Sequence, residues 1–73
     1  MADQSVVLFH STAHAIRAET VLGRAGVKIK MIPTPRQLSS DCGMALRFDR
    51  QDQVRVVATL AESGVPTNGI YPI

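Results

Sequence analysis

The chain has 73 residues, of which 45% are hydrophobic and only 4% aromatic, and its formal net charge is +2. This length predicts one small domain, residues 1–73, with a thin aliphatic core, and the hydrophobic content excludes a disordered chain. The weak positive charge falls short of what nucleic-acid binding needs, and no apolar run could cross a membrane. We expect no secretory signal, because residues 1–4 lack the basic start of one and no apolar h-region follows. Without a disulfide framework, we expect a reducing, cytoplasmic location.

The first two predicted elements are a buried strand and a helix. Residues 5–10 form a run of β-forming side chains that ends at His10. Ser11-Thr12 then offers an N-cap side chain for a helix over residues 13–25, and Gly26 follows as its C-terminal cap. The apolar stripe of this helix comprises Ala15, Ala18, Leu22 and Ala25.

Two further strands are predicted on either side of a long loop. Alternation of apolar and polar residues over residues 27–31 indicates a half-buried strand, which Pro33 and Pro35 end because proline cannot donate a ladder hydrogen bond. A serine-rich loop leads to a third strand over residues 42–48. One face of that strand carries Cys42, Met44, Leu46 and Phe48.

The last two elements are a second helix and a weak strand. Either Asp49 or Asp52 can cap a helix that extends to about Ser63, and Gly64 ends it. The predicted buried stripe of this helix, spaced i, i+3, i+4 and i+7, comprises Val54, Val57, Ala58 and Ala61. An edge strand or an irregular one is predicted over residues 69–73, because the tail contains Pro66 and Pro72.

The order of elements, β-α-β-β-α-β, predicts an α+β fold of the ferredoxin-like type. This βαββαβ sandwich has an antiparallel sheet in the order 4-1-3-2, with both helices on one face. In that topology the end of the first strand and the start of the third strand are neighbours, and the first helix begins at the same edge. His10, Cys42 and the helix N-terminus should therefore converge, with Arg36 in the same loop as Cys42.

Cys42 is the only cysteine, so it cannot form an internal disulfide or build a cysteine-rich metal site. Its remaining uses are packing, nucleophilic chemistry or pairing with another molecule. A helix N-terminus, Arg36 or a protonated His10 would stabilise the thiolate and lower the thiol pKa below its usual value of about 8.5. A neutral imidazole could instead accept the thiol proton. We therefore take Cys42, Arg36 and His10 as the candidate catalytic residues.

The loop and the strand that follows it resemble a known family. Residues 32–48, with the core Pro-Arg-Gln-Leu-Ser-Ser-Asp-Cys-Gly at residues 35–43, resemble the small bacterial putative selenium/sulfur carrier protein-like family. Residues 9–19 resemble the other characteristic stretch of that family, so the likeness covers nearly the whole chain. The resemblance implies a carrier, rather than a free-standing enzyme, that holds a persulfide or its selenium analogue on Cys42. It implies no cofactor, and the partners are a persulfide donor such as a cysteine desulfurase and an acceptor protein.

Structural interpretations of the same residues stay open. Cys42 has the parity of the core residues of its strand, and the chain could be a non-catalytic binding or oligomerisation module, such as a homodimer, with a structural Cys42. His10 and His14 could make ordinary hydrogen bonds at a strand end and a helix edge. Arg36 could simply hold its loop by bonding to carbonyls.

Two other binding functions are disfavoured. A zinc site from His10, His14 and Cys42 would rest on a spacing unlike that of two histidines on one helix face, so we expect no metal. An RNA-binding sheet face lacks the aromatic side chains that stack on bases, so a solvated face or a dimer surface is favoured. The residues considered for that face are Lys28, Lys30, Arg47 and Phe9.

Overall fold

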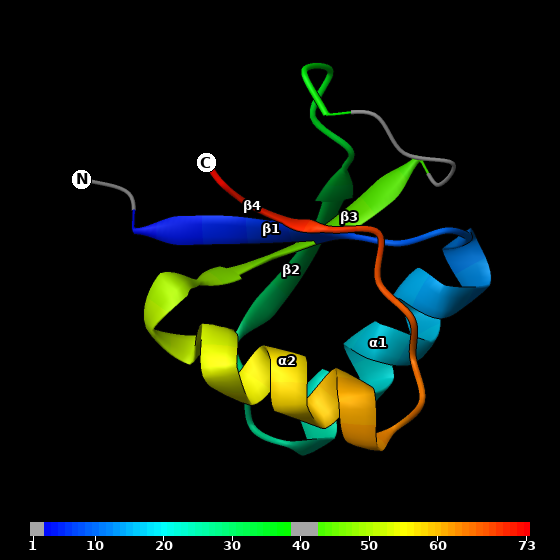
Figure 1. Ribbon diagram of the computed structural model, residues 1–73, viewed down its shortest axis with the longest axis vertical. Helices are drawn as coiled ribbons and strands as arrows, with labels where there is room; N and C mark the ends of the chain where they lie inside the picture. The colour runs from blue at the N-terminus through cyan, green and yellow to red at the C-terminus, as the bar shows by residue number, and fades with distance from the viewer. Residues whose placement is uncertain (1–2, 39–42) are drawn as a thin grey trace.

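The structure is a computed structural model that describes residues 3–38 and 43–73. The helices and strands follow in the order β1 (Gln4–Leu8), α1 (Thr12–Arg24), β2 (Ile29–Pro33), β3 (Met44–Asp49), α2 (Gln53–Glu62) and β4 (Ile70–Pro72), with a short 3-10 turn, Arg50–Asp52, before α2. Figure 1 shows both helices on one side of the sheet. This arrangement confirms the predicted α+β sandwich.

The sheet has four strands in the order β2-β3-β1-β4, and each neighbouring pair is antiparallel. This is the predicted ferredoxin-like order. Leu8 at the end of β1 lies opposite Ala45 near the start of β3. Pro33 at the end of β2 lies opposite Met44, the first residue of β3. The predicted neighbour relation between the end of β1 and the start of β3 is therefore confirmed.

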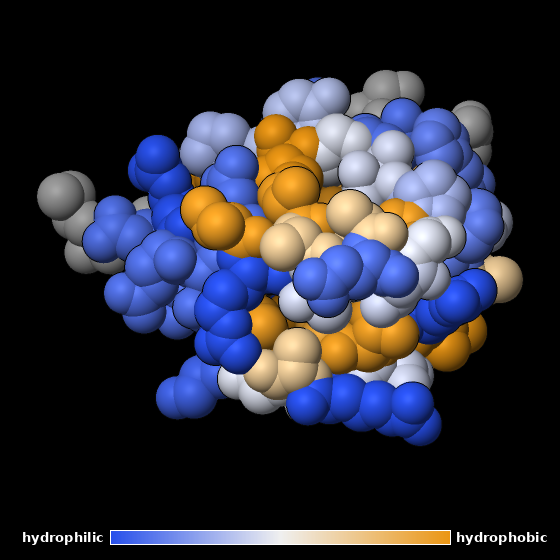
Figure 2. Space-filling view, turned by 60° about the horizontal axis from the view of Figure 1, so that its bottom comes forward, coloured by the Kyte–Doolittle hydropathy of each residue, from blue (hydrophilic) through white to orange (hydrophobic). Residues whose placement is uncertain are grey.

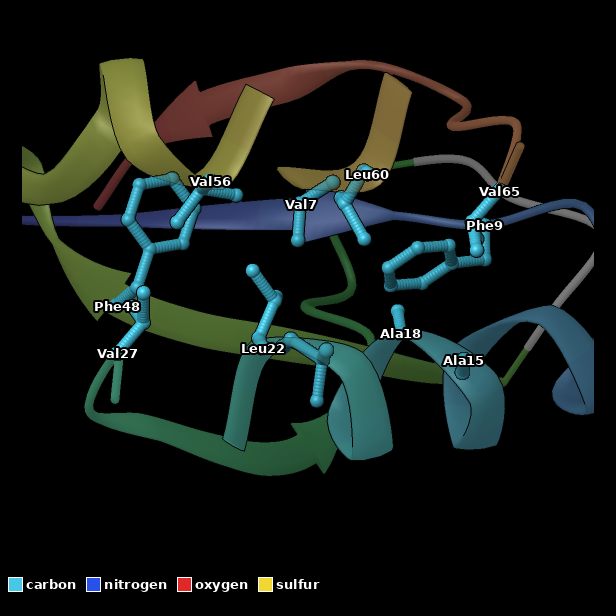
Figure 3. Close-up of a cluster of buried hydrophobic side chains, with 11 residues drawn as sticks. Val7, Phe9, Ala15, Ala18, Leu22, Val27, Phe48, Val56, Leu60 and Val65 are labelled. Atoms are coloured by element: carbon cyan, nitrogen blue, oxygen red, sulfur yellow. The ribbon is translucent and has the colours of Figure 1, made fainter. Parts of the chain in front are cut away.

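The main core fills the space between the sheet and the helices (Figure 3). The predicted stripe of α1 faces this core, with Ala15, Ala18 and Leu22 fully buried. Phe9 and Phe48 lie at opposite ends of the cluster and are its two largest fully buried side chains. The buried members are Val7, Phe9, Ala15, Ala18, Leu22, Val27, Leu46, Phe48, Val56, Leu60 and Val65.

A second, smaller cluster lies on the face of the sheet that the helices leave open. Val6, Leu8 and Ala45 are fully buried there, and Ile32 and Leu38 pack against them. Leu38 reaches this face from the loop after β2, where its N–H donates to the Pro35 carbonyl at 3.0 Å. The loop therefore covers part of the second face, and β1 is buried on both sides.

The ends of α1 match the prediction to within one residue, whereas several strand ends differ from it. Gly26 has a φ of 79°, the left-handed conformation typical of a helix C-terminus. β1 ends at Leu8 instead of His10, because the chain turns away there to enter α1. Pro33 is the last residue of β2 and does not end the strand before it, since an edge strand tolerates a missing donor. β3 begins at Met44, two residues later than predicted.

The predicted buried stripe of α2 is wrong. Val54 is 80% exposed and Val57 is 47% exposed, whereas the buried residues of α2 are Val56 and Leu60. Leu60 is the largest apolar side chain of the helix, and Val56 precedes it by one turn, so this pair removes more apolar volume from water than a face with two alanines. The prediction was wrong because it used the helical spacing of apolar residues and did not take the size of their side chains into account.

Candidate functional site

The candidate site region is the edge of the sheet where the long loop meets the first helix. The ladder between β2 and β3 extends one bond beyond Pro33, because the Thr34 N–H donates to the Gly43 carbonyl at 3.0 Å. Figure 1 shows that β3 starts on the side of the molecule where α1 begins. Both ends of the loop that contains Cys42 are therefore anchored at this edge.

The N-terminus of α1 is capped by a side chain from the same edge. Ser11 is the N-cap residue, with extended backbone, and its hydroxyl oxygen accepts a hydrogen bond from the His14 N–H at 3.3 Å. The first turn of α1 carries no acidic residue, so no carboxylate of that turn offsets the partial positive charge of the helix end. The edge therefore favours a negative charge near the loop.

The structure places two of the three candidate catalytic residues. His10 is exposed in a bend between β1 and α1. Arg36 is exposed in the turn that the hydrogen bond from Leu38 to Pro35 closes. Cys42 lies outside the described residues, so the convergence of its thiol with His10, Arg36 and the helix N-terminus stays a prediction.

His14 has a property that the sequence did not indicate. Its side-chain Nδ1 is buried and has no hydrogen-bond partner among the described residues. A buried polar atom without a partner costs about 1–3 kcal/mol, so such atoms are rare in folded proteins. No sequence pattern predicts the burial of this nitrogen. The first turn of α1 and the edge of the sheet are far apart in the sequence and come together only in the folded chain.

A basic depression of about 190 Å³ lies at the opposite end of the sheet. Lys30 stands directly opposite Arg47 across the β2–β3 ladder, and Lys28 precedes β2. The lining residues are Gln4, Lys28, Ile29, Lys30, Arg47, Phe48 and Asp49.

The aromatic residue considered for an RNA-binding face is elsewhere. Phe9 is fully buried in the core between sheet and helices, so it cannot stack on a base at the open face. Phe9 lies on the opposite side of the sheet from Arg47, so the expectation that both residues share the open face is wrong.

The described part of the chain contains neither a metal-binding cluster nor a membrane-spanning helix. Residues 3–38 and 43–73 hold no group of three or more His, Cys, Asp or Glu side chains that could bind a metal ion. The zinc alternative with Cys42 includes a residue outside these ranges and is not tested. Within the same ranges, each helix is too short or too polar to traverse a lipid bilayer.

Comparison with known proteins finds one relationship. A family model described as putative Se/S carrier protein-like matches residues 4–72. The match includes the loop with Cys42 and every helix and strand of the fold. No curated protein and no solved structure matches the chain.

Proposed function

The chain belongs to the putative Se/S carrier protein-like family, and from this premise we propose that it carries sulfur or selenium covalently on Cys42. The observation that carries the proposal is the family match over residues 4–72, taken with the presence of a single cysteine in the chain. A thiolate is the side chain best suited to hold a sulfur atom that must later be released, because it attacks and leaves as the same anion.

The proposed cycle conserves atoms and electrons. The Cys42 thiolate attacks the outer sulfur of a donor persulfide, so that a new sulfur–sulfur bond forms while the old one breaks and the donor thiolate leaves. An acceptor thiolate then attacks the same outer sulfur and releases Cys42 as a thiolate. No external oxidant or reductant is consumed, and a selenium atom in the outer position follows the same two displacements.

The anchored loop supports this chemistry through its place in the fold. The N-terminus of α1 lies at the edge where the loop ends, and a helix N-terminus stabilises a nearby anion. His10 and Arg36 are exposed on segments that flank this edge. The Arg36 cation and the His10 proton acceptor are therefore accessible to a partner protein that binds there. In the proposal, Arg36 stabilises the thiolate and His10 accepts the thiol proton.

The proposed partners are two proteins with persulfide chemistry. A donor such as a cysteine desulfurase supplies the sulfur, and a second protein accepts it. The cycle returns the carrier unchanged only when both are present. The chain is therefore proposed as a shuttle between partners, and not as a free-standing enzyme.

The test is mass spectrometry of the intact reduced protein after incubation with a persulfide donor. We expect a mass increase of one sulfur atom that a reducing thiol removes. Cys42→Ser should show no increase. Glu19→Cys in the Cys42→Ser background provides a matched control, since Glu19 is exposed on α1 and supplies an ordinary surface thiol.

The control separates a carrier thiol from a merely accessible one. The proposal requires faster loading of Cys42 than of the cysteine at position 19, and alkylation of Cys42 in the folded protein with a midpoint below pH ~8.5. Equal loading rates, or alkylation of Cys42 only in denaturant, would remove the basis of the proposal. The second outcome would favour a structural Cys42 in a binding module.

A further inference from the structure

The basic depression at the end of the sheet carries the net charge of the chain. The chain has 8 Lys and Arg and 6 Asp and Glu side chains. Three of these cations and one of these acids line the depression, which leaves five of each elsewhere. The cations are Lys28, Lys30 and Arg47, and the acid is Asp49. The formal excess of +2 is therefore concentrated at one end of the sheet.

The register of the ladders extends the depression into a row of side chains across the open face. Arg47 pairs with Lys30 on one side and with Val6 on the other, and Val6 pairs in turn with Tyr71. Val6 belongs to the small cluster on the open face, so its ladder partners point to the same side. Neighbouring strands lie about 4.8 Å apart, so about 10 Å separates the Arg47 and Tyr71 backbones.

The two cations of this row repel each other. Lys30 and Arg47 stand directly opposite across the β2–β3 ladder, which is unfavourable for like charges. Within residues 3–38 and 43–73, neither side chain has a hydrogen bond or an ion pair. The carboxylate of the depression, Asp49, instead accepts a hydrogen bond from the Gln4 amide at 3.4 Å. An anion between the two cations would replace this repulsion by two attractions.

Two cations on the side of the helices are used differently. Arg17 of α1 donates to the Ser63 carbonyl at 3.0 Å, and Arg55 of α2 donates to the Ala25 carbonyl. These bonds join each helix to the end of the other. Figure 2 shows this side, where hydrophobic side chains gather across the middle with hydrophilic groups around and between them. The open face, in contrast, leaves its adjacent cations available to another molecule.

Tyr71 adds an aromatic ring to the open face. The ring packs on Gly69, since a Cβ at that glycine would lie 2.8 Å from it. The side chain is nevertheless 41% exposed. Tyrosine and arginine are among the residue types that contribute most to binding energy at protein–protein interfaces. A ring that is held in place before binding loses little conformational entropy when a partner covers it.

We infer that the row formed by Lys30, Arg47 and Tyr71 binds an acidic segment of a partner protein, with Lys28 at the rim of the contact. Carboxylates of the partner lie between Lys30 and Arg47, and an apolar side chain next to them covers the Tyr71 ring. Charge complementarity identifies the chemistry of this occupant, because the contact removes the repulsion that the ladder builds into the free chain.

Two other anionic occupants fit this face less well. A nucleic acid needs several stacking rings, whereas Phe9 and Phe48 are buried and Tyr71 is the one remaining aromatic residue of the chain. A small anion needs donors in fixed positions, whereas Lys28 and Lys30 are exposed on long flexible side chains. A partner protein supplies carboxylates and an apolar contact together, so it matches both the cations and the ring.

The inference is tested by a two-dimensional NMR titration of the reduced, isotopically labelled full chain with a short glutamate-rich peptide that contains one leucine. We expect weak binding with the largest shifts at backbone amides around Lys30 and Arg47, and a dissociation constant that rises with added salt. Arg47→Ala should raise the dissociation constant at least about fivefold, and Tyr71→Ala at least about twofold. Arg24→Ala is the charge-matched control, since Arg24 is exposed in the last turn of α1, and should leave binding unchanged.

A charge reversal separates binding from folding. Lys30→Glu places a carboxylate opposite Arg47, so it should raise the thermal midpoint of unfolding while it weakens peptide binding at least about tenfold. A lower midpoint together with lost binding would show that Lys30 serves the fold, and this result would overturn the inference.

No binding, equal binding of the same peptide with glutamine in place of glutamate, or a titration indifferent to Arg47→Ala would also overturn it. Tighter binding of inorganic phosphate or of a single-stranded RNA oligonucleotide at the same residues would do the same. The inference does not rest on the carrier proposal, because no step of it involves Cys42. Persulfide loading and peptide titration are separate measurements on the same chain, so either result can fail alone.

Discussion

Two of the three valines of α2, Val54 and Val56, allow a direct test of which face of the helix supports the fold. Val56 is fully buried against the core and Val54, two positions earlier, is 80% exposed. The same substitution to alanine at both sites removes the same atoms from one helix. The difference between the two variants therefore measures burial alone, because the change in helix propensity is common to both.

The expected losses differ widely. Val56→Ala removes two buried carbon groups worth about 0.8 kcal/mol each and leaves a small cavity, whereas alanine recovers a few tenths of a kcal/mol in helix propensity. We expect a net loss of about 1.5–2.5 kcal/mol. Val54→Ala loses almost no buried surface, so its effect should lie between zero and a gain of about 0.5 kcal/mol.

The measurement is urea unfolding followed by far-UV circular dichroism. Both variants should unfold with the m-value of the parent protein, which shows that only stability has changed. In thermal melts, Val56→Ala should lower Tm by about 6–20 °C, at about 4–8 °C per kcal/mol for a domain of this size. Equal losses of unfolding free energy in the two variants would refute the assignment of Val56 to the buried face of α2 and Val54 to the exposed one.

Three other substitutions test separate contacts. Ser11→Ala removes the hydroxyl that accepts the His14 N–H and should cost about 1 kcal/mol in thermal melts, whereas Ser11→Asp should keep the cap; no loss in the alanine variant would contradict the capping role. Gly69→Ala should cost more than about 1 kcal/mol, because φ is +107° and the new Cβ would lie 2.8 Å from the Tyr71 ring. Adding Tyr71→Ala should recover only the steric part, and full recovery in urea would show that the backbone is unstrained. Leu38→Ala should cost about 1–2 kcal/mol by uncovering the second face of the sheet, and Leu38→Met should cost less than 1 kcal/mol; a neutral Leu38→Ala would show that the loop does not cover that face.

Much of the fold was predictable because its signals are local. The cap at Ser11 and the left-handed Gly26 bound α1 through the chemistry of a few neighbouring residues. The strand order followed from the succession of elements and the handedness of their connections. The predicted strand ends were less accurate, because the length of a hydrogen-bonded ladder depends on the partner strand as well. Pro33 illustrates this, because it remains in β2 where Met44 extends the pairing.

The parts that could not be predicted depend on tertiary contacts. The face of α2 that is buried is set by how much volume the core can take, which favours Leu60 over the alanines. Leu38 stands alone in a loop, so no periodicity marks it as a cover for the second face of the sheet. At the candidate site, topology places His10 and Arg36 on segments that flank one edge of the sheet. Their distance from Cys42 depends on loop conformation, which residue spacing does not determine.

The central position of β1 has a consequence for the synthesis of the chain. β1 precedes both of its ladder partners, residues 45–49 and 70–72, and therefore leaves the ribosome before either of them. The buried residues of β1, Val6, Val7 and Leu8, therefore lie in a strand that cannot be paired on both edges until synthesis has passed residue 72, and such long-range pairing folds slowly. We expect nascent chains that stop before Ile70 to keep one edge of β1 open, which is the kind of edge that recruits other chains and aggregates.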